Sequence, residues 1–460
     1  MERPQHREKE LQYFCLGTAV LLFFAAFWFG DIEEIVEGMI EIVRSRDALI
    51  TDYFQIAGYG TGFFNAAVML LFAMGLVYIA KVPYSGVTLA AIFLNVGFAF
   101  WGKNPVNVLP IVFGTWCYAR LHRLHFARVV YTAIFATCLA PFVTELMYIL
   151  PFTPVWNLLI AIIVGIMIGF VAPPLSMHTA SMHMGYNLFN VGFASGILAF
   201  VIYSILKSMG IQSQAVFFWR AEQNKTILLG MFFYFLVTFF VGMWLAEGKL
   251  KGLFKISRHP GRAVADFVMM DGAGTTLMNM GILGMAAEFY VIVVDGDLSG
   301  PVVGGILAVF AFAAFGANIR NYTPVLIGVY IAGVYSVYPV DSPSMLIAAM
   351  FVVGISPIAG QFGILAGIIS GMIHVAVVNC TSQLYGGLNL YNNGFAAGFV
   401  AIVMVPLIES GMRRFEMRKH EKREELKLKN PALLDKILHF EMRKNGIMHK
   451  NEIKQKEEIE

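Results

Sequence analysis

The chain has 460 residues, of which 58% are hydrophobic and only 14% are charged. This composition excludes a soluble globular protein, because the charged residues are too few to coat one. The formal net charge of +3 gives no support to nucleic-acid binding, since multi-pass membrane proteins carry basic loops for another reason. The four scattered cysteines predict neither a disulfide framework nor a metal site, and we expect no cofactor.

Apolar segments follow one another along most of the chain. The run Thr226–Trp244 has no charged residue and would span about 30 Å of hydrocarbon as a helix, which satisfies its own backbone in lipid. The segment 344–378 is too long for one crossing, so we expect twelve to fourteen crossings in an all-α fold. The segments lie at about residues 11–30, 54–80, 84–101, 105–120, 128–150, 155–172, 190–206, 226–246, 268–294, 298–316, 318–338, 344–378 and 390–408.

From Arg413 onward the composition changes to alternating positive and negative charges. We expect a solvated cytoplasmic tail of two surface helices, broken at Asn430-Pro431. A regulatory or partner-binding role of this tail is the alternative.

The chain contains an internal repeat. A shift of 214 residues places uncommon residue types on their own kind, and a shift of 202 does so further along. The first shift aligns Gly58, Gly60, Thr61, Asn65, Gly102, Asn104, Asn107, Pro110 and Gly114 with Gly272, Gly274, Thr275, Asn279, Gly316, Asn318, Asn321, Pro324 and Gly328. The second shift aligns Gly185–Gly196 with Gly387–Gly398. Matches of glycine, asparagine, threonine and proline carry weight, because their conformations matter, whereas matches of leucine would not.

Loop charges predict that the two copies are inverted. The stretch Asp31–Asp52 before the first copy is acidic, whereas Lys249–Arg262 before the second is basic. By the positive-inside rule, the first copy starts outside and the second inside, with both termini cytoplasmic in a cell inner membrane. The predicted division is an N-terminal span with an acidic outer loop (1–53), a first repeat (54–206), a linker with one span (207–263), a second, inverted repeat (264–410) and a charged cytoplasmic tail (411–460), with about six spans in each repeat.

Inverted repeats commonly place a substrate site near the bilayer midplane, where broken or re-entrant helices expose backbone groups. One candidate pair of breaks is glycine-rich and ends at Asn65 and Asn279; another pairs Pro173–Asn190 with Asn379–Asn393. Pro173-Pro174 is predicted to end the preceding helix, and the polar residues after it suit a path rather than lipid. The candidate substrate-binding residues are Asn65, Asn279, Thr179, Asn187, Asn190, Thr381, Asn389, Asn392, Asn393 and His178. These amides and glycines could instead serve helix packing.

A third symmetric pair, Asn104–Pro110 and Asn318–Pro324, is either a half-helix or a tight turn between spans.

The sequence has no HExxH, GxSxG, P-loop or CxxC motif, and we expect a protein that is not an enzyme.

Two carboxylates, Glu288 and Glu145, lie inside apolar segments. Such residues are costly in lipid and indicate proton or sodium coupling, unless the residue lies near the interface. His178 and His183 are five residues apart, which is not the one-face spacing of a helical metal pair, so path lining or packing is expected. His374 is expected to be a buried, hydrogen-bonded histidine.

The repeated block G-x-N-L-[YF]-N-x-G-F-A-x-G, at Gly185–Gly196 and Gly387–Gly398, and the N-x-x-P turns at Asn107 and Asn321 resemble a family of bacterial multi-pass proteins. That family is catalogued only as a domain of unknown function, so the resemblance, which covers nearly all but the tail, implies no assigned activity. In architecture alone, the two inverted halves are similar to urea-transporter-like channels. The L-P-x-x-T-x-P-F pattern of those channels is missing here.

These features predict a transporter or channel for a small polar solute, neutral or monoanionic, because the candidate path is rich in amides and nearly free of fixed charge. The expected partners are the solute, the lipid bilayer, a coupling proton or sodium ion and further copies in a homo-oligomer. The alternative is a non-transporting membrane scaffold or sensor that acts through its tail.

Overall fold

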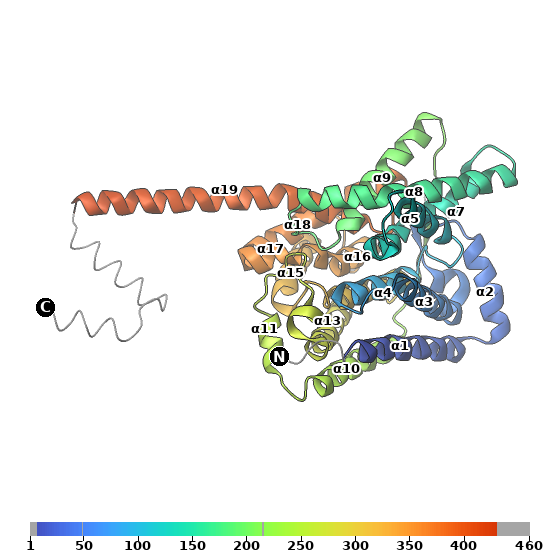
Figure 1. Ribbon diagram of the computed structural model, residues 1–460, viewed down its shortest axis with the longest axis horizontal. Coiled ribbons are helices and arrows are strands. Elements are labelled where there is room, and N and C mark those ends of the chain that lie inside the picture. The colour runs from blue at the N-terminus through green and yellow to red at the C-terminus, as the bar shows by residue number, and fades with distance from the viewer. Residues whose placement is uncertain (1–6, 48, 214–215, 430–460) are drawn as a thin grey trace. The chain divides into compact units, whose positions relative to one another are not determined.

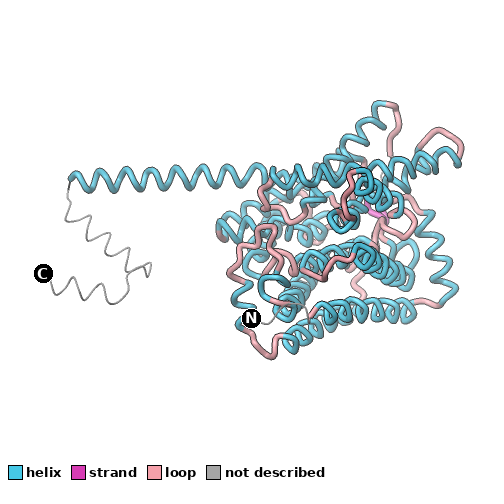
Figure 2. Tube along the Cα trace, viewed as in Figure 1, coloured by secondary structure: helices cyan, strands magenta, loops and turns pink. Residues whose placement is uncertain are grey.

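The computed structural model describes residues 7–47, 49–213 and 216–429, and these are almost entirely helical (Figures 1 and 2). In this part of the chain, two strands of three residues, β1 (Leu49–Thr51) and β2 (Val216–Phe218), pair in parallel. The described residues form two units, one up to Val403 and one from Met404 onward. The all-α prediction is confirmed.

The helices follow in two series along the chain. The first series is α1 (Glu8–Phe29), α2 (Ile32–Arg44), α3 (Tyr53–Ala80), α4 (Gly86–Phe98), α5 (Leu109–Leu121), η2 (Phe126–Arg128), α6 (Val130–Ala136), η3 (Thr137–Leu139), α7 (Ala140–Ile149), α8 (Pro154–Met182) and α9 (Asn190–Ser208). The second is α10 (Lys225–Leu245), α11 (Lys251–Ile256), α12 (Phe267–Asp271), α13 (Ala273–Val293), α14 (Gly300–Phe312), α15 (Ile319–Tyr335), α16 (Pro343–Phe351), η4 (Val352–Ile355), α17 (Ser356–Phe362), α18 (Ile364–Thr381), η5 (Ser382–Tyr385) and α19 (Asn392–Lys429).

Ten helical segments of the described residues are long and apolar enough to cross a membrane, which makes this a multi-pass membrane protein. The prediction of about six spans in each repeat, and of twelve to fourteen crossings in all, is therefore wrong. Two of the apolar segments counted as spans form α4 and α14, which have only 13 residues each. A helix of that length is about 20 Å long and cannot cross a hydrocarbon core of about 30 Å.

The long segment 344–378 is divided between two candidate spans, 343–362 and 364–385. The break is at Gly363, whose φ of 93° lies in the region that glycine alone adopts readily. A single glycine thus ends α17 and starts α18 within one continuous apolar run.

Pro173-Pro174 does not end a helix, contrary to the prediction: α8 continues through both prolines to Met182. Proline has no N–H, so Pro173 cannot donate to the carbonyl of Gly169, four residues earlier. The hydroxyl of Thr115 on α5 donates to that carbonyl instead, at 2.9 Å. A contact distant in sequence therefore replaces the missing helical hydrogen bond.

The short helices α4 and α14 lie in the core of the first unit and cross each other at two glycines. A Cβ atom on Gly97 would lie 2.6 Å from the carbonyl oxygen of Gly304, and one on Gly304 would lie 2.3 Å from that of Gly97. Since no side chain fits at either position, the two backbones are in direct contact.

The outer helices of the two series also correspond. Helix α1 packs on α3 as α10 packs on α13, and α1 and α10 lie side by side (Figure 1), with Thr18 Oγ1 and Tyr234 OH 3.0 Å apart. The acidic stretch after α1 forms α2, which Asp31 and Glu34 start with a capping box. Helix α19 starts in the first unit at Asn392 and is helical to Lys429, and the predicted break at Asn430-Pro431 lies outside the described residues.

Candidate functional site

Asn65 and Asn279, two predicted site residues, make the same contacts 214 residues apart. In each case the side-chain nitrogen donates to the carbonyl oxygens of the residues 34 and 38 positions further along the chain. The distances are 2.6 and 2.8 Å in the first series and 2.7 and 2.8 Å in the second. Each amide therefore ties the end of α4 or α14 to the long helix α3 or α13.

Asp52 and Asp266 each cap the short helix of the opposite series. Asp52 Oδ1 accepts a hydrogen bond from the N–H of Gly300 at the start of α14, at 3.0 Å. Asp266 Oδ1 accepts one from the N–H of Gly86 at the start of α4, at 2.8 Å. A carboxylate at a helix N-terminus also balances the helix dipole. Burial raises the pKa of Asp52 to about 6, against the effect of the N–H donors around it.

Four further predicted residues close the turns that precede α9 and α19. The hydroxyl of Thr179 donates to Asn190 Oδ1 at 2.9 Å, and that of Thr381 donates to Asn392 Oδ1 at 2.8 Å. Each asparagine then donates from its side-chain nitrogen to a carbonyl of the preceding helix. His183 shares Asn190 Oδ1, at 2.9 Å, and its counterpart Tyr385 binds Asn392 Oδ1.

The remaining predicted amides also bond within the protein. Asn187 and Asn389 each accept from the backbone N–H two residues ahead, and Asn187 Nδ2 donates to the carbonyl of Gly394, at 3.2 Å, which joins the two turns. Asn393 Oδ1 lies 3.1 Å from Nε2 of His374, which is buried and hydrogen-bonded as predicted. His178 is exposed on α8 and does not join this group.

A cluster of aromatic rings lies where the two turns meet the ends of the short helices. The rings of Phe189 and Tyr391, one from each turn, have centroids 4.8 Å apart. Phe98, the last residue of α4, is 5.3 Å from Tyr391, and Phe312, the last residue of α14, is 4.6 Å from Phe189. Phe351 stacks on Phe98 at 5.8 Å. We call these five residues the central cluster, and it brings together the breaks of both series.

Lys103 lies beside the central cluster, although the sequence analysis did not single it out. It is 1% exposed, its Nζ donates to Asn95 Oδ1 at 2.9 Å, and Nζ is 5.2 Å from the centroid of the Phe98 ring. Its signal in the sequence is isolation, since it is the one charged residue between Lys81 and Arg120. A lone cation within apolar membrane sequence indicates function by the same argument as a lone carboxylate.

The two predicted coupling carboxylates lie in different surroundings. Glu145 is fully buried and pairs with Arg46, whose Nε is 3.1 Å from Oε2, and it accepts from Ser213 Oγ at 2.8 Å. Glu288, on α13, is 2% exposed, and neither of its carboxylate oxygens has a hydrogen-bond partner among the described residues.

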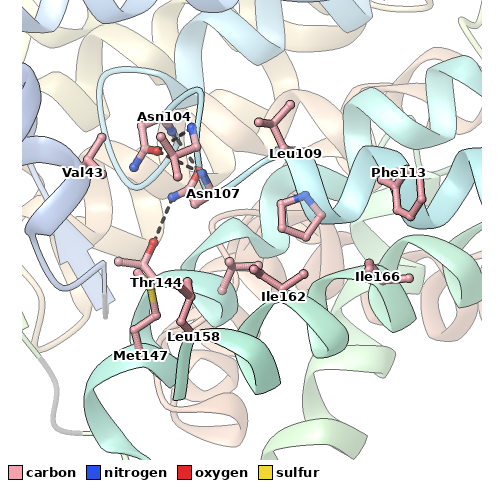
Figure 3. Close-up of a pocket in the computed structure, with 13 residues that line it drawn as sticks. Val43, Asn104, Asn107, Leu109, Phe113, Thr144, Met147, Leu158, Ile162 and Ile166 are labelled. Atoms are coloured by element: carbon pink, nitrogen blue, oxygen red, sulfur yellow. Dashed lines mark hydrogen bonds between the residues drawn. The ribbon is translucent and has the colours of Figure 1, made fainter. Parts of the chain in front are cut away.

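A cavity of about 420 Å³ opens between α5, α7 and α8, with polar groups at one end and apolar walls (Figure 3). At its polar end, Asn107 Nδ2 donates to Thr144 Oγ1 at 3.1 Å and to Asp47 Oδ2 at 3.3 Å. The equivalent Asn321 donates instead to the carbonyl of Pro260, at 3.2 Å. The predicted third pair of breaks therefore consists of turns that start helices, and Asn318 caps α15.

Comparison with known proteins yields one match. No curated protein and no solved structure matches the chain. Residues 31–208 and 245–410 match a protein family of unknown function, DUF1576, and the gap between the two stretches contains all of α10 except its last residue, Leu245. The chain belongs to this family, DUF1576.

Proposed function

We propose that this protein is a membrane transporter that moves a small polar solute along a path between two inverted halves. The contact between the short helices supports this proposal most directly: α4 and α14 cross at Gly97 and Gly304, and each is capped by an aspartate of the other half. Short helices that end inside a membrane protein leave polar groups near the bilayer midplane, where transporters built from repeats bind their substrates.

The number of spans supports the inversion of the halves. Each series contributes five of the ten candidate spans. An odd number of crossings turns the second half upside down, provided that α4–α5 and α14–α15 return to the side from which they enter. The acidic stretch before the first half and the basic stretch before the second then face opposite sides, with both termini in the cytoplasm.

The path runs along the turns before α9 and α19, past the central cluster. In the described conformation the amides at these turns bond to backbone and to threonine, so the path is closed there. Rocking of one half against the other would open it on one side at a time.

A flux assay tests the proposal. The purified full chain in proteoliposomes is mixed rapidly with urea, glycerol, sodium formate or sodium nitrate, and volume changes are followed by light scattering. We expect at least one solute to enter several times faster than into protein-free liposomes. A protein that accelerates none of them contradicts the proposal.

A variant without residues 413–460 should keep this flux. A scaffold or sensor that acts through its tail would show no flux, whether the tail is present or deleted.

Glu288 is the proposed coupling residue, because its buried carboxylate has no partner among the described residues. Glu288→Gln should abolish acceleration of uptake by an inward proton gradient while leaving uptake without a gradient within about threefold. Glu409→Gln, at a partly exposed carboxylate, is the matched control. Uptake by Glu288→Gln that still follows the gradient as in the wild type would exclude proton coupling at this residue.

A further inference from the structure

The surroundings of the central cluster differ between the halves in one consistent direction. Where a position near Lys103 is polar, its equivalent near Ala317 is apolar. The pairs are Lys103 and Ala317, Asn95 and Val309, Trp101 and Phe315, and Tyr391 and Phe189. The last pair is matched by equivalent backbone bonds of the preceding residue, since Leu390 N donates to Cys138 O and Leu188 N donates to Gly354 O.

The duplication acts as an internal control for the role of these polar groups. The second half builds the same helix end, held by the same asparagine bonds, with alanine where the first half has Lys103. The fold therefore does not require a cation at this position. Burying an ammonium without a carboxylate partner costs free energy. The presence of Lys103 is therefore explained by a function rather than by the fold.

Three side chains that carry hydrogen-bond donors pack around the ring of Phe98. The Nζ of Lys103 is 5.2 Å from its centroid, and the rings of Trp101 and Tyr391 are 5.7 and 5.3 Å from it. The indole N–H of Trp101 and the hydroxyl of Tyr391 are buried without a hydrogen-bond partner among the described residues. Among the described residues, the ammonium of Lys103 makes one hydrogen bond, to Asn95, and no ion pair with a carboxylate.

A small anion matches this set of groups. An ammonium with N–H groups to spare, an indole N–H and a phenol O–H are all donors, and an anion with two or three oxygens can accept from them together. A neutral solute would leave the charge of Lys103 uncompensated, and a cation would be repelled by it.

We propose that Lys103, Trp101 and Tyr391 bind a small oxygen-bearing monoanion, of the carboxylate type, within the path between the halves. This inference rests on the proposed transport function and narrows its substrate class from neutral or monoanionic to monoanionic. Asn95 positions the Lys103 ammonium, and the central cluster closes around the anion.

Anion binding is measured as stabilisation of the purified protein against thermal unfolding in detergent. Sodium formate, acetate or nitrate replaces sodium gluconate at constant ionic strength, so that only the small monoanion varies. The wild type should show a saturable rise in unfolding temperature, because a ligand that binds the folded state stabilises it. The half-saturating concentration should increase at least tenfold in Lys103→Gln and stay within about threefold in Lys103→Arg.

Two substitutions by phenylalanine keep the test decisive if Lys103→Gln does not fold. Trp101→Phe and Tyr391→Phe each place the residue type of the equivalent position and remove one donor while keeping a ring. Each should weaken anion binding several-fold, whereas Lys81→Gln, at an exposed lysine, should leave it unchanged.

The outcomes separate this inference from the proposed function. Flux of urea or glycerol without saturable stabilisation by any of the three anions overturns the inference and leaves transport standing. The inference is also overturned if Lys103→Gln, Trp101→Phe and Tyr391→Phe all have the half-saturating anion concentration of the wild type. Absence of flux for every solute contradicts the proposed function itself.

Discussion

Buried polar side chains in this protein mostly bond to backbone rather than to one another. Asn65 and Asn279 each use both N–H groups of the amide on two carbonyls at the end of a short helix. A carbonyl left unpaired in a membrane interior costs about 1–3 kcal/mol, so such amides are needed wherever a helix ends inside the protein. Lys103, Glu288 and Tyr391 depart from this rule, and they are therefore the better candidates for function.

Asp47 should make the protein less stable at alkaline than at acidic pH. It is 1% exposed, and burial raises its pKa to about 7, although bonds from Tyr53 and Thr144 oppose the rise. An unfolded aspartate has a pKa near 3.9, so the folded state holds the proton more tightly between these values. The stabilisation is full below about pH 4 and is lost as the pH rises through about 7.

The change from pH 5 to pH 8 should cost the wild type about 4 kcal/mol of unfolding free energy, of which Asp47 accounts for about 2–3 kcal/mol, measured by denaturant titration in detergent. Asp47→Asn should remove most of this difference and leave a smaller one from Asp52, whose pKa burial raises to about 6. Asp341→Asn, at an exposed aspartate, should keep the full difference. An Asp47→Asn protein with the pH dependence of the wild type would show that other groups cause it.

At the scale of the elements, the crossing of α4 and α14 is the most constrained contact. Gly97→Ala would place Cβ 2.6 Å from the carbonyl oxygen of Gly304, which belongs to a rigid backbone and cannot move alone. We expect a loss of about 1–3 kcal/mol or more in unfolding free energy, because the two helices must separate. Gly75→Ala on α3, where nothing lies within 4 Å, should be neutral or slightly stabilising. Equal unfolding temperatures for the two variants would contradict the close contact.

The elements also show which features could be predicted from the sequence. Gly58 and Gly272 match in the repeat because both have positive φ, 79° and 87°, at the same bend. The ends of α4 and α14 could not be predicted, since they lie inside continuous apolar segments and depend on tertiary ties from asparagine. The continuation of α8 through Pro173 could not be predicted either, because it depends on a hydrogen bond from Thr115, which is distant in sequence.

The candidate site, too, could be predicted from the sequence only in part. The sequence identified the asparagines and threonines of both turns, and the structure brings Asn187 of one turn to Gly394 at the other. It could not distinguish an amide that ties backbone from one that lines a path, because both have the same residue type and periodicity. Lys103 could have been noticed as the one charged residue between Lys81 and Arg120, but only the structure shows which side chains surround it.

At the scale of the whole molecule, the proposed inversion makes equivalent residues face opposite sides of the membrane. Lys81 and Asp295 follow the ends of α3 and α13, are 214 residues apart, and have nearly the same φ, 54° and 53°. Both are exposed, so a cysteine at either position can react. If the halves are inverted and the basic loops are cytoplasmic, Asp295 lies outside and Lys81 inside.

Lys81→Cys and Asp295→Cys, each in a chain whose four native cysteines are replaced by serine, test this arrangement. A membrane-impermeant thiol reagent added to intact cells should label Asp295→Cys and should label Lys81→Cys only after the membrane is opened. Equal labelling of both from one side would mean that the halves face the same way. The short helices would then enter from the same side, their ends could not form a two-fold path, and the transport proposal would lose its physical basis even though the contacts between α4 and α14 remain.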